Sequence, residues 1–174
     1  MAAADMNPAR YHVMDSPVGP LLLAMAPDGL CAVDFLATSA LDHRVASLRQ
    51  RFPEHAWEAG PCAEAVDQIE AYFAGRLRAF RVPVILRGTA FQLAVWNALR
   101  AIPYGQTRTY ADMALAAGRR VGASRAAGAA CGANPVAIVV PCHRVVGTGG
   151  SLTGFGGGLA VKRWLLQHEG ALIA

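Results

Sequence analysis

The chain has 174 residues and a formal net charge of +4, and 54% of its residues are hydrophobic. This length allows one or two small domains with a proper core, but no stretch approaches the roughly 18 uninterrupted apolar residues that a membrane span requires. The N-terminus lacks a basic region followed by an apolar core, so we expect no signal peptide, no membrane partner and a cytoplasmic protein.

Cysteine spacing argues against two further classes of protein. The four cysteines are Cys31, Cys62, Cys131 and Cys142. They are far apart and form no CxxC pair, which disfavours a zinc site, and a reducing cytosol disfavours disulfides. We therefore expect no metal and no cofactor.

Charge is divided unevenly along the chain. Residues 1–85 hold seven Arg against ten Asp and Glu, whereas residues 86–174 hold nine Lys and Arg against two Asp and Glu. A basic half of this kind suits a polyanion, most simply nucleic acid. An ordinary basic surface gives the same composition, so charge alone leaves both explanations open.

The first half predicts a small α/β domain. Three apolar runs joined by short turns predict the strands of an antiparallel meander, at 11–15, 20–26 and 30–36. Helical spacing predicts helices at 41–51 and 62–74, and the proline-bearing segment 82–86 predicts an edge strand. We assign this domain to residues 1–86, with a loose tail at 1–9, and expect a scaffold because it shows no convergent polar site.

The second half, residues 87–174, predicts a mainly helical domain. Periodic apolar residues predict helices at 90–100 and 159–168. Two shorter helices, at 110–117 and from 122 or 123 to 131, flank a glycine-bearing turn. This pattern predicts a helix-turn-helix motif, although a plain helical hairpin fits it as well. The fold class is thus α/β, of the α+β kind, with an antiparallel sheet followed by helices.

The most distinctive motif is the run Pro141-Cys142-His143-Arg144-Val145. The apolar segment 136–140 precedes it and predicts a short buried strand that the proline ends. A thiol becomes a strong nucleophile where a base or positive charge favours its thiolate, and His143 and Arg144 are suited to this. Free cysteines are also common apolar fillers, so adjacency alone leaves the role of Cys142 open.

This motif, with Asn134 upstream, resembles the active site of the O6-alkylguanine-DNA alkyltransferases. Segment 88–96 is similar to that family's FQ-x-x-VW helix, 102–107 to its IPYGxT turn and 168–170 to its HEG sequence. Together these matches extend over most of residues 86–170.

Two positions depart from the family pattern. Ala127 stands where Val is common, which affects packing more than chemistry. Phe155 stands where Tyr is common, so the ring can still stack on a base but any hydrogen bond from a hydroxyl is lost.

The resemblance implies direct reversal of DNA damage by a methylated-DNA–protein-cysteine S-methyltransferase. The alkyl group of O6-alkylguanine, or less readily of O4-alkylthymine, would pass from double-stranded DNA to the protein's own cysteine after the damaged nucleotide is flipped out. An S-alkyl cysteine has no easy hydrolytic exit, so the protein would act once. We expect a monomer in solution, and the sequence leaves alkyl-size preference and cooperative binding to DNA open.

The resemblance also implies roles for single residues. Cys142 would be the nucleophile, His143 its base, directly or through a water, and Glu169 the group that orients His143. Tyr110 would donate a proton to the guanine ring, and Asn134 would fix the turn between the second helix of the helix-turn-helix and the strand that leads to the cysteine.

Other residues are implied to bind DNA or to line the pocket. The DNA-binding set is Tyr110, Ser124, Arg125, Ala126 and Arg144. The pocket set is Pro141, Val145, Phe155, Gly156 and Lys162. Arg125 would take the place of the extruded base, while Arg144 would either hold a phosphate or brace the site.

Three alternatives remain at this stage. A cysteine hydrolase or acyltransferase would use Cys142, His143 and Glu169 with turnover. A DNA-binding protein without chemistry, similar to the alkyltransferase-like proteins, would replace the cysteine, which is present here. A transcription regulator related to this domain would carry a metal-binding module with clustered cysteines, which the sequence lacks.

Overall fold

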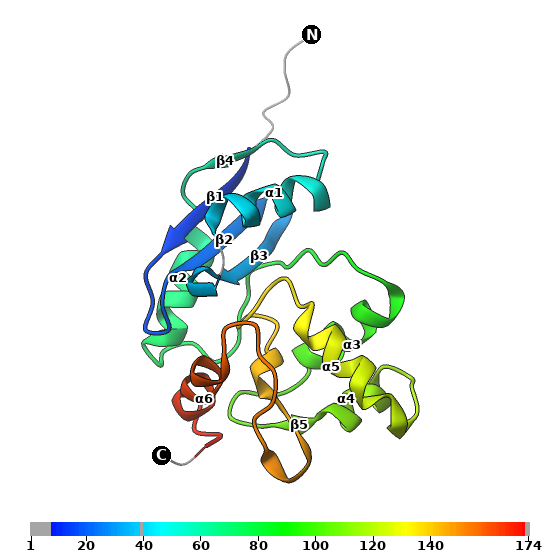
Figure 1. Ribbon diagram of the computed structural model, residues 1–174. Coiled ribbons are helices and arrows are strands. Elements are labelled where there is room, and N and C mark those ends of the chain that lie inside the picture. Colours follow the sequence, from blue (N-terminus) through cyan, green and yellow to red (C-terminus); the bar gives the residue numbers. More distant parts are fainter. Residues whose placement is uncertain (1–7, 39, 173–174) are drawn as a thin grey trace. The chain divides into compact units, whose positions relative to one another are not determined.

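The computed structural model describes residues 8–38 and 40–172, and its elements are labelled in Figure 1. The chain divides into two compact units, residues 1–85 and 86–174. None of the helices described is long and apolar enough to cross a membrane. Most of the tail expected at 1–9 lies outside the described residues, and the first strand already begins at Ala9.

A four-stranded sheet forms the centre of the first unit. Its strands are β1 (Ala9–Met14), β2 (Leu21–Ala26), β3 (Gly29–Phe35) and β4 (Trp57–Ala59). The predicted antiparallel meander of β1, β2 and β3 is confirmed. Sequence reasoning missed β4, which pairs parallel to β1 and gives the strand order β3-β2-β1-β4. A three-residue strand is too short to produce a recognisable alternation of polar and apolar residues.

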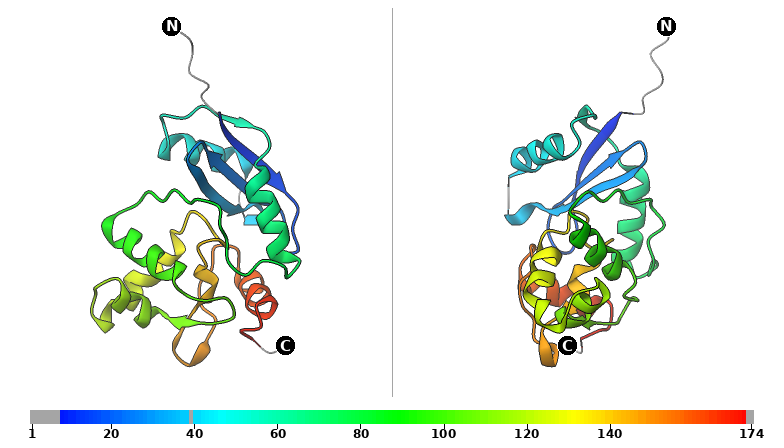
Figure 2. Two further views of the ribbon diagram at one scale, coloured as in Figure 1. Left: turned by 180° about the vertical axis from the view of Figure 1, so that it is seen from behind. Right: turned by 90° about the vertical axis from the view of Figure 1, so that its right-hand side faces the viewer.

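Two helices cover opposite faces of this sheet, α1 (Leu41–Arg51) and α2 (Ala63–Phe73) (Figure 2). Strand β2 has the sequence LLLAMA and is almost wholly buried, as expected for a strand that is covered on both faces. The edge strand predicted at 82–86 is reduced to a single bridge between Val84 and Leu30.

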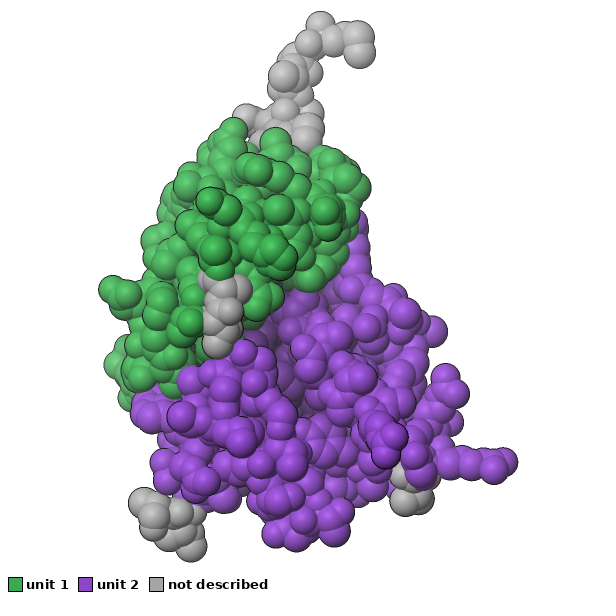
Figure 3. Space-filling model, viewed as in Figure 1, with its two compact units in different colours: residues 1–85 green, residues 86–174 purple. Residues whose placement is uncertain are grey.

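The second unit, purple in Figure 3, is mainly helical. Its helices are α3 (Ala90–Arg100), α4 (Tyr110–Ala116), α5 (Ser124–Gly132) and α6 (Leu159–His168). The first two begin at capping boxes, in which Thr89 and Thr109 accept hydrogen bonds from the backbone of the residue three positions on. Helices α4 and α5 form the predicted helix-turn-helix. A two-stranded parallel sheet joins β5 (Arg108–Thr109) to β6 (Val145–Val146).

The strand predicted at 136–140 is wrong, because this segment forms a turn. The Val140 amide donates to the Val136 carbonyl at 2.9 Å, and Ile138 has a positive φ of 71°. An apolar run reports burial but not backbone shape, and these residues are buried in a turn instead of a ladder. A β-branched residue with positive φ is strained, so the turn must be held by its surroundings.

Candidate active site

The side chain of Asn134 holds the strained turn together. Its Nδ2 donates to the Val140 carbonyl at 2.7 Å, and its Oδ1 accepts from the Val136 amide at 3.0 Å. A 3-10 turn, Cys142–Arg144, follows directly. Asn134 was expected to fix the turn that leads from α5 into a strand, and its side chain instead bonds the two ends of the turn that replaces this strand.

Cys142 is a buried thiol that requires a base. Its residue is 8% exposed, and burial raises the pKa of the thiol, while the hydrogen bond from Asn134 and the charge of Lys162 lower it only in part. The thiol is therefore protonated at neutral pH. A reaction through the thiolate needs a group that accepts this proton.

The adjacent His143 is held by Glu169. Its Nε2 lies 2.7 Å from Oε1 of Glu169, and both side chains are fully buried. Burial would raise the pKa of the Glu169 carboxyl, but the hydrogen bonds from His143 and Arg144 outweigh it and lower the pKa to about 2. A carboxylate only accepts hydrogen bonds, so Nε2 carries the hydrogen.

The other ring nitrogen of His143 is then free to act as a base. Burial lowers the pKa of His143, with Glu169 opposing the shift, so the ring is neutral at pH 7. Its lone pair lies on Nδ1, which is buried and has no hydrogen-bond partner within the described part of the chain. The structure thus pairs the ring of His143, which directly follows Cys142 in the chain, with the carboxylate of Glu169, as a base and its orienting group would require.

Arg144 belongs to the same buried cluster. Its Nε and Nη2 donate to the two carboxylate oxygens of Glu169 at 2.8 and 3.0 Å, and its Nη1 donates to the Ile102 carbonyl at 2.6 Å. The residue is only 6% exposed. This geometry corrects the DNA-binding role predicted for Arg144, because a guanidinium engaged in this way braces the site and does not reach a phosphate.

A second cluster joins α4, α6 and the glycine-rich loop, residues 147–158. The fully buried amine of Lys162 donates to the Thr153 carbonyl at 2.9 Å and to the Tyr110 hydroxyl at 3.3 Å. The same hydroxyl donates to the Thr153 carbonyl at 3.1 Å. Tyrosine has one hydroxyl hydrogen, so Tyr110 must turn it away from Thr153 before it can donate to a bound base.

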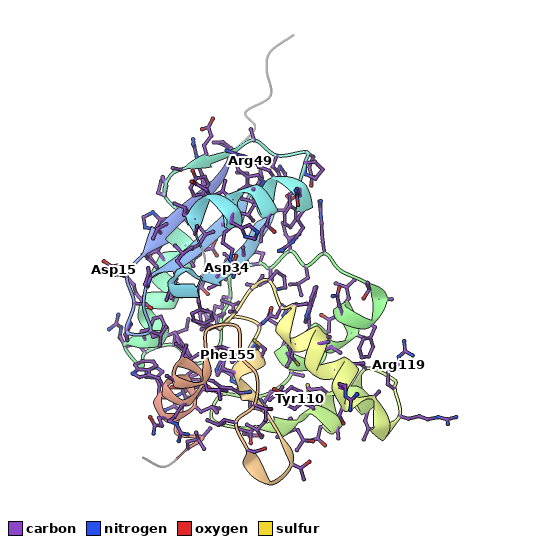
Figure 4. All side chains as sticks on the ribbon, in the orientation of Figure 1. Asp15, Asp34, Arg49, Tyr110, Arg119 and Phe155 are labelled. Carbon is purple, nitrogen blue, oxygen red and sulfur yellow. The ribbon has the colours of Figure 1, made fainter. Side chains whose placement is uncertain are left out.

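A cavity of about 570 Å³ opens between the helix-turn-helix and the glycine-rich loop. It is lined by Tyr110, by the α5 residues Ser124, Arg125, Gly128 and Gly132, and by residues 153–156. Figure 4 labels two lining residues, Tyr110 and Phe155. Lys162 connects this cavity to the thiol, since it bonds Tyr110 and its charge acts on Cys142.

The predicted pocket and DNA-binding residues divide into two sets. Five of them lie on the cavity wall, as expected for residues that contact a base or DNA: Tyr110, Ser124, Arg125, Phe155 and Gly156. Of the described residues, the remaining ones predicted for these roles are not part of the lining: Ala126, Pro141, Arg144, Val145 and Lys162. The first of these is exposed on α5, and the other four are buried.

Small side chains distinguish the surface of α5. Its sequence is SRAAGAACG, in which Arg125 is the long side chain. The helix is held from behind, because Trp96 of α3 donates to the Ala130 carbonyl at 2.8 Å, and Ala127 is fully buried. Arg125 is exposed in the first turn. A helix of this kind can approach a groove closely with a single projecting cation.

Several functional groups escaped sequence reasoning. The Thr153 and Ile102 carbonyls are backbone acceptors for Lys162 and Arg144, and backbone acceptors have no signature in a sequence. Gly128 and Gly132 line the cavity, for which the run of small residues in α5 was the available signal. Across the described ranges, no group of three or more His, Cys, Asp or Glu side chains is arranged to hold a metal ion.

Two family models together match almost the whole described chain. Residues 9–86 match the ribonuclease-like domain of 6-O-methylguanine DNA methyltransferase, and residues 90–171 match the DNA-binding domain of the same family. The chain belongs to the 6-O-methylguanine DNA methyltransferase family. The resemblance of the cysteine motif is thereby confirmed at the level of both domains.

Relatives of this family are similar to the chain over nearly their full length. The methylated-DNA–protein-cysteine methyltransferase of Methanosarcina acetivorans is 45% identical over 163 residues, covering 92% of this chain and 98% of the relative. The protein of that name from Mycobacterium bovis is 48% identical, with 91% of each chain covered. The structure of Mycobacterium tuberculosis OGT in complex with DNA is 46% identical and matches with a TM-score of 0.80 over 92% of each chain.

Proposed function

We propose that this methyltransferase repairs O6-alkylguanine in double-stranded DNA by moving the alkyl group onto the sulfur of Cys142. The observation that carries the proposal is the buried pair of His143 and Glu169 directly after the cysteine, with Nδ1 of the ring left unbonded in the described chain. This pair supplies the base that a buried thiol needs. The activity class follows from the family, whose relatives are named for methyl transfer to a protein cysteine.

The side chains of the site account for each proton and each bond in the reaction. The proton of the Cys142 thiol passes to Nδ1 of His143, directly or through a water, and Glu169 stabilises the resulting imidazolium. The thiolate attacks the alkyl carbon, a C–S bond forms and the bond from that carbon to O6 breaks. The electron pair stays on the guanine, which takes the proton of Tyr110 and leaves neutral. Lys162, bonded to the Tyr110 oxygen, stabilises the phenolate.

The target atom lies inside the base stack, so the nucleotide must be flipped out. The cavity between α5 and the glycine-rich loop is the place for the extruded base, and Phe155 offers a ring on which it can stack. Arg125 lies on the wall of this cavity and would fill the gap left in the duplex. In this arrangement residues 87–174 bind DNA and accept the alkyl group, and residues 1–86 form a scaffold.

The product is a thioether, so each molecule acts once. The test is to titrate the protein with excess duplex containing O6-methylguanine and to count methyl groups transferred, with Cys142→Ser as control. We expect a plateau at one methyl group per active protein, and none for the serine variant. Sustained turnover would instead support the cysteine hydrolase, and binding without transfer would support the alkyltransferase-like alternative.

A further inference from the structure

Two adjacent arginines lie at the turn between α4 and α5 and take no part in the chemistry described above. Arg119 and Arg120 are both exposed. The guanidinium carbon of Arg119 lies 5.1 Å from the centre of the Phe91 ring, the geometry of a cation–π contact. Figure 4 labels Arg119 at the edge of this unit.

The backbone of this turn is well defined. Gly118 ends α4 with a positive φ of 77°, and the Arg119 amide donates to the Ala114 carbonyl at 2.8 Å, which forms a Schellman cap. The Arg120 carbonyl accepts from the Ala123 amide at 2.9 Å and so begins the 3-10 turn that leads into α5. Both arginines therefore start from fixed backbone positions.

A surface hollow of about 540 Å³ accompanies the two cations. Its wall is Gly118, Arg119, Arg120, Gly122 and Ala123. A Cβ added at Gly122 would meet no atom within 4 Å, so the hollow is open at this point. The lining carries charge of one sign, because Arg119 and Arg120 are its charged members.

We propose that Arg119 and Arg120 form a phosphate-binding subsite for one DNA strand at the turn of the helix-turn-helix. The inference rests on the proposed function, since it takes the DNA backbone as the ligand. A backbone phosphate suits an open hollow with two guanidinium groups, and Arg125, five residues beyond Arg120, lies in the first turn of α5, the helix that would face the same duplex. Phosphate contacts fix register on the duplex without reading its sequence.

The two arginines have different parts in this subsite. Stacking on Phe91 holds the guanidinium of Arg119 in place before DNA arrives, which reduces the ordering cost of binding. Arg120 supplies the second charge from the neighbouring backbone position. Phe91 is thus a positioning residue that acts through Arg119.

Salt-dependent binding tests the subsite. Affinity for an undamaged duplex is measured over a range of salt for wild type, Arg119→Ala, Arg120→Ala and Arg49→Ala, the last removing an exposed arginine of α1 as a charge-matched control. We expect each turn variant to flatten the slope of log K against log salt by about one and to weaken binding equally on damaged and undamaged duplexes. Arg49→Ala should leave the slope unchanged.

Phe91→Leu separates positioning from charge. This variant keeps both arginines, so it should weaken binding while leaving the salt slope at the wild-type value. Reaction with free O6-benzylguanine, which needs no duplex, should proceed at the wild-type rate in all of these variants.

Two results would overturn the subsite: turn variants with unchanged salt slopes, or an equal loss of slope in Arg49→Ala, which would indicate a general effect of net charge. Failure of the proposed function would look different. Wild-type protein would then accept no methyl group from damaged DNA, whatever the salt slopes of the turn variants.

Discussion

Nε2 of His143 and Oε1 of Glu169 lie 2.7 Å apart in a site from which solvent is excluded. The same carboxylate receives two hydrogen bonds from Arg144 and one, at 3.3 Å, from the Gly105 amide. Glu169 therefore orients both the proposed base, His143, and the buried guanidinium of Arg144. Its chemical and structural roles can be separated by changing its two side-chain partners one at a time.

Replacement of His143 by Gln should slow alkyl transfer at pH 7 by about 10²- to 10⁴-fold, the usual contribution of a general base. Because burial raises the pKa of Cys142, the variant should regain rate as the pH rises toward the range in which the thiol ionises without help. Single-turnover rates on damaged duplex across pH measure this. A wild-type rate at pH 7 would show that another group takes the proton.

Arg144→Met should act on stability and not on DNA binding. It removes one partner of a buried ion pair, so we expect the free energy of unfolding to fall by about 3 kcal/mol. Urea denaturation gives this value, and binding over a range of salt gives the number of phosphate contacts. The opposite result would be a variant as stable as wild type whose slope of log K against log salt is lower by about one. That result would show that Arg144 contacts a DNA phosphate.

Acid should destabilise the protein in two overlapping steps. The pKa of His143 and that of Glu169 are both lower in the folded protein than in the unfolded chain. Each group therefore contributes its full stabilisation at pH values above its unfolded pKa, and this stabilisation is lost as the pH falls toward its folded pKa. For His143 the loss begins near its ordinary value of 6.5. For Glu169 it runs from 4.5 to about 2 and amounts to roughly 3 kcal/mol at 1.36 kcal/mol per pKa unit.

Unfolding free energies from urea titrations between pH 7.5 and 3.5 check both steps. His143→Gln is the control, because it should remove the part of the decline that begins near pH 6.5. A wild-type stability that stays constant down to pH 4 would contradict the assignment of a neutral His143 beside an ionised Glu169.

Helices with clear ends were predictable from the sequence. The bounds expected for α1, α3 and α6 agree with the structure, and in α3 Thr89 and Gln92 form the capping box that fixes its start. Such signals are local, so a single sequence contains them.

The turn before Cys142 was not predictable, because its shape depends on Asn134 and on a strained Ile138. The candidate catalytic residues were named as a group through the motif, and their roles stay predictions. The hydrogen bond from Arg144 to Glu169, 25 residues away, was not predicted. A sequence does not show whether an arginine binds a phosphate or braces the site once the chain is folded.

Arg125→Ala tests base flipping. If Arg125 fills the space of the extruded base, it offsets the base stacking that is lost on flipping, which is worth a few kcal/mol. Repair of duplex DNA by the alanine variant should therefore slow by up to several orders of magnitude. Reaction with free O6-benzylguanine should change far less, because that substrate needs no flipping. Equal defects on both substrates would mean that Arg125 supports the pocket or the fold.

The identity of the alkyl acceptor is the central claim, and mass spectrometry tests it most directly. After reaction with duplex containing O6-methylguanine, the intact protein should gain about 14 Da, the mass of one methylene, as expected for a covalent thioether. Fragmentation should place this mass on Cys142. The buried Cys131, whose pKa burial raises to about 12, is an internal control for an unreactive thiol. A methyl group found on Cys131, or no mass gain in protein that has repaired its DNA, would contradict the account.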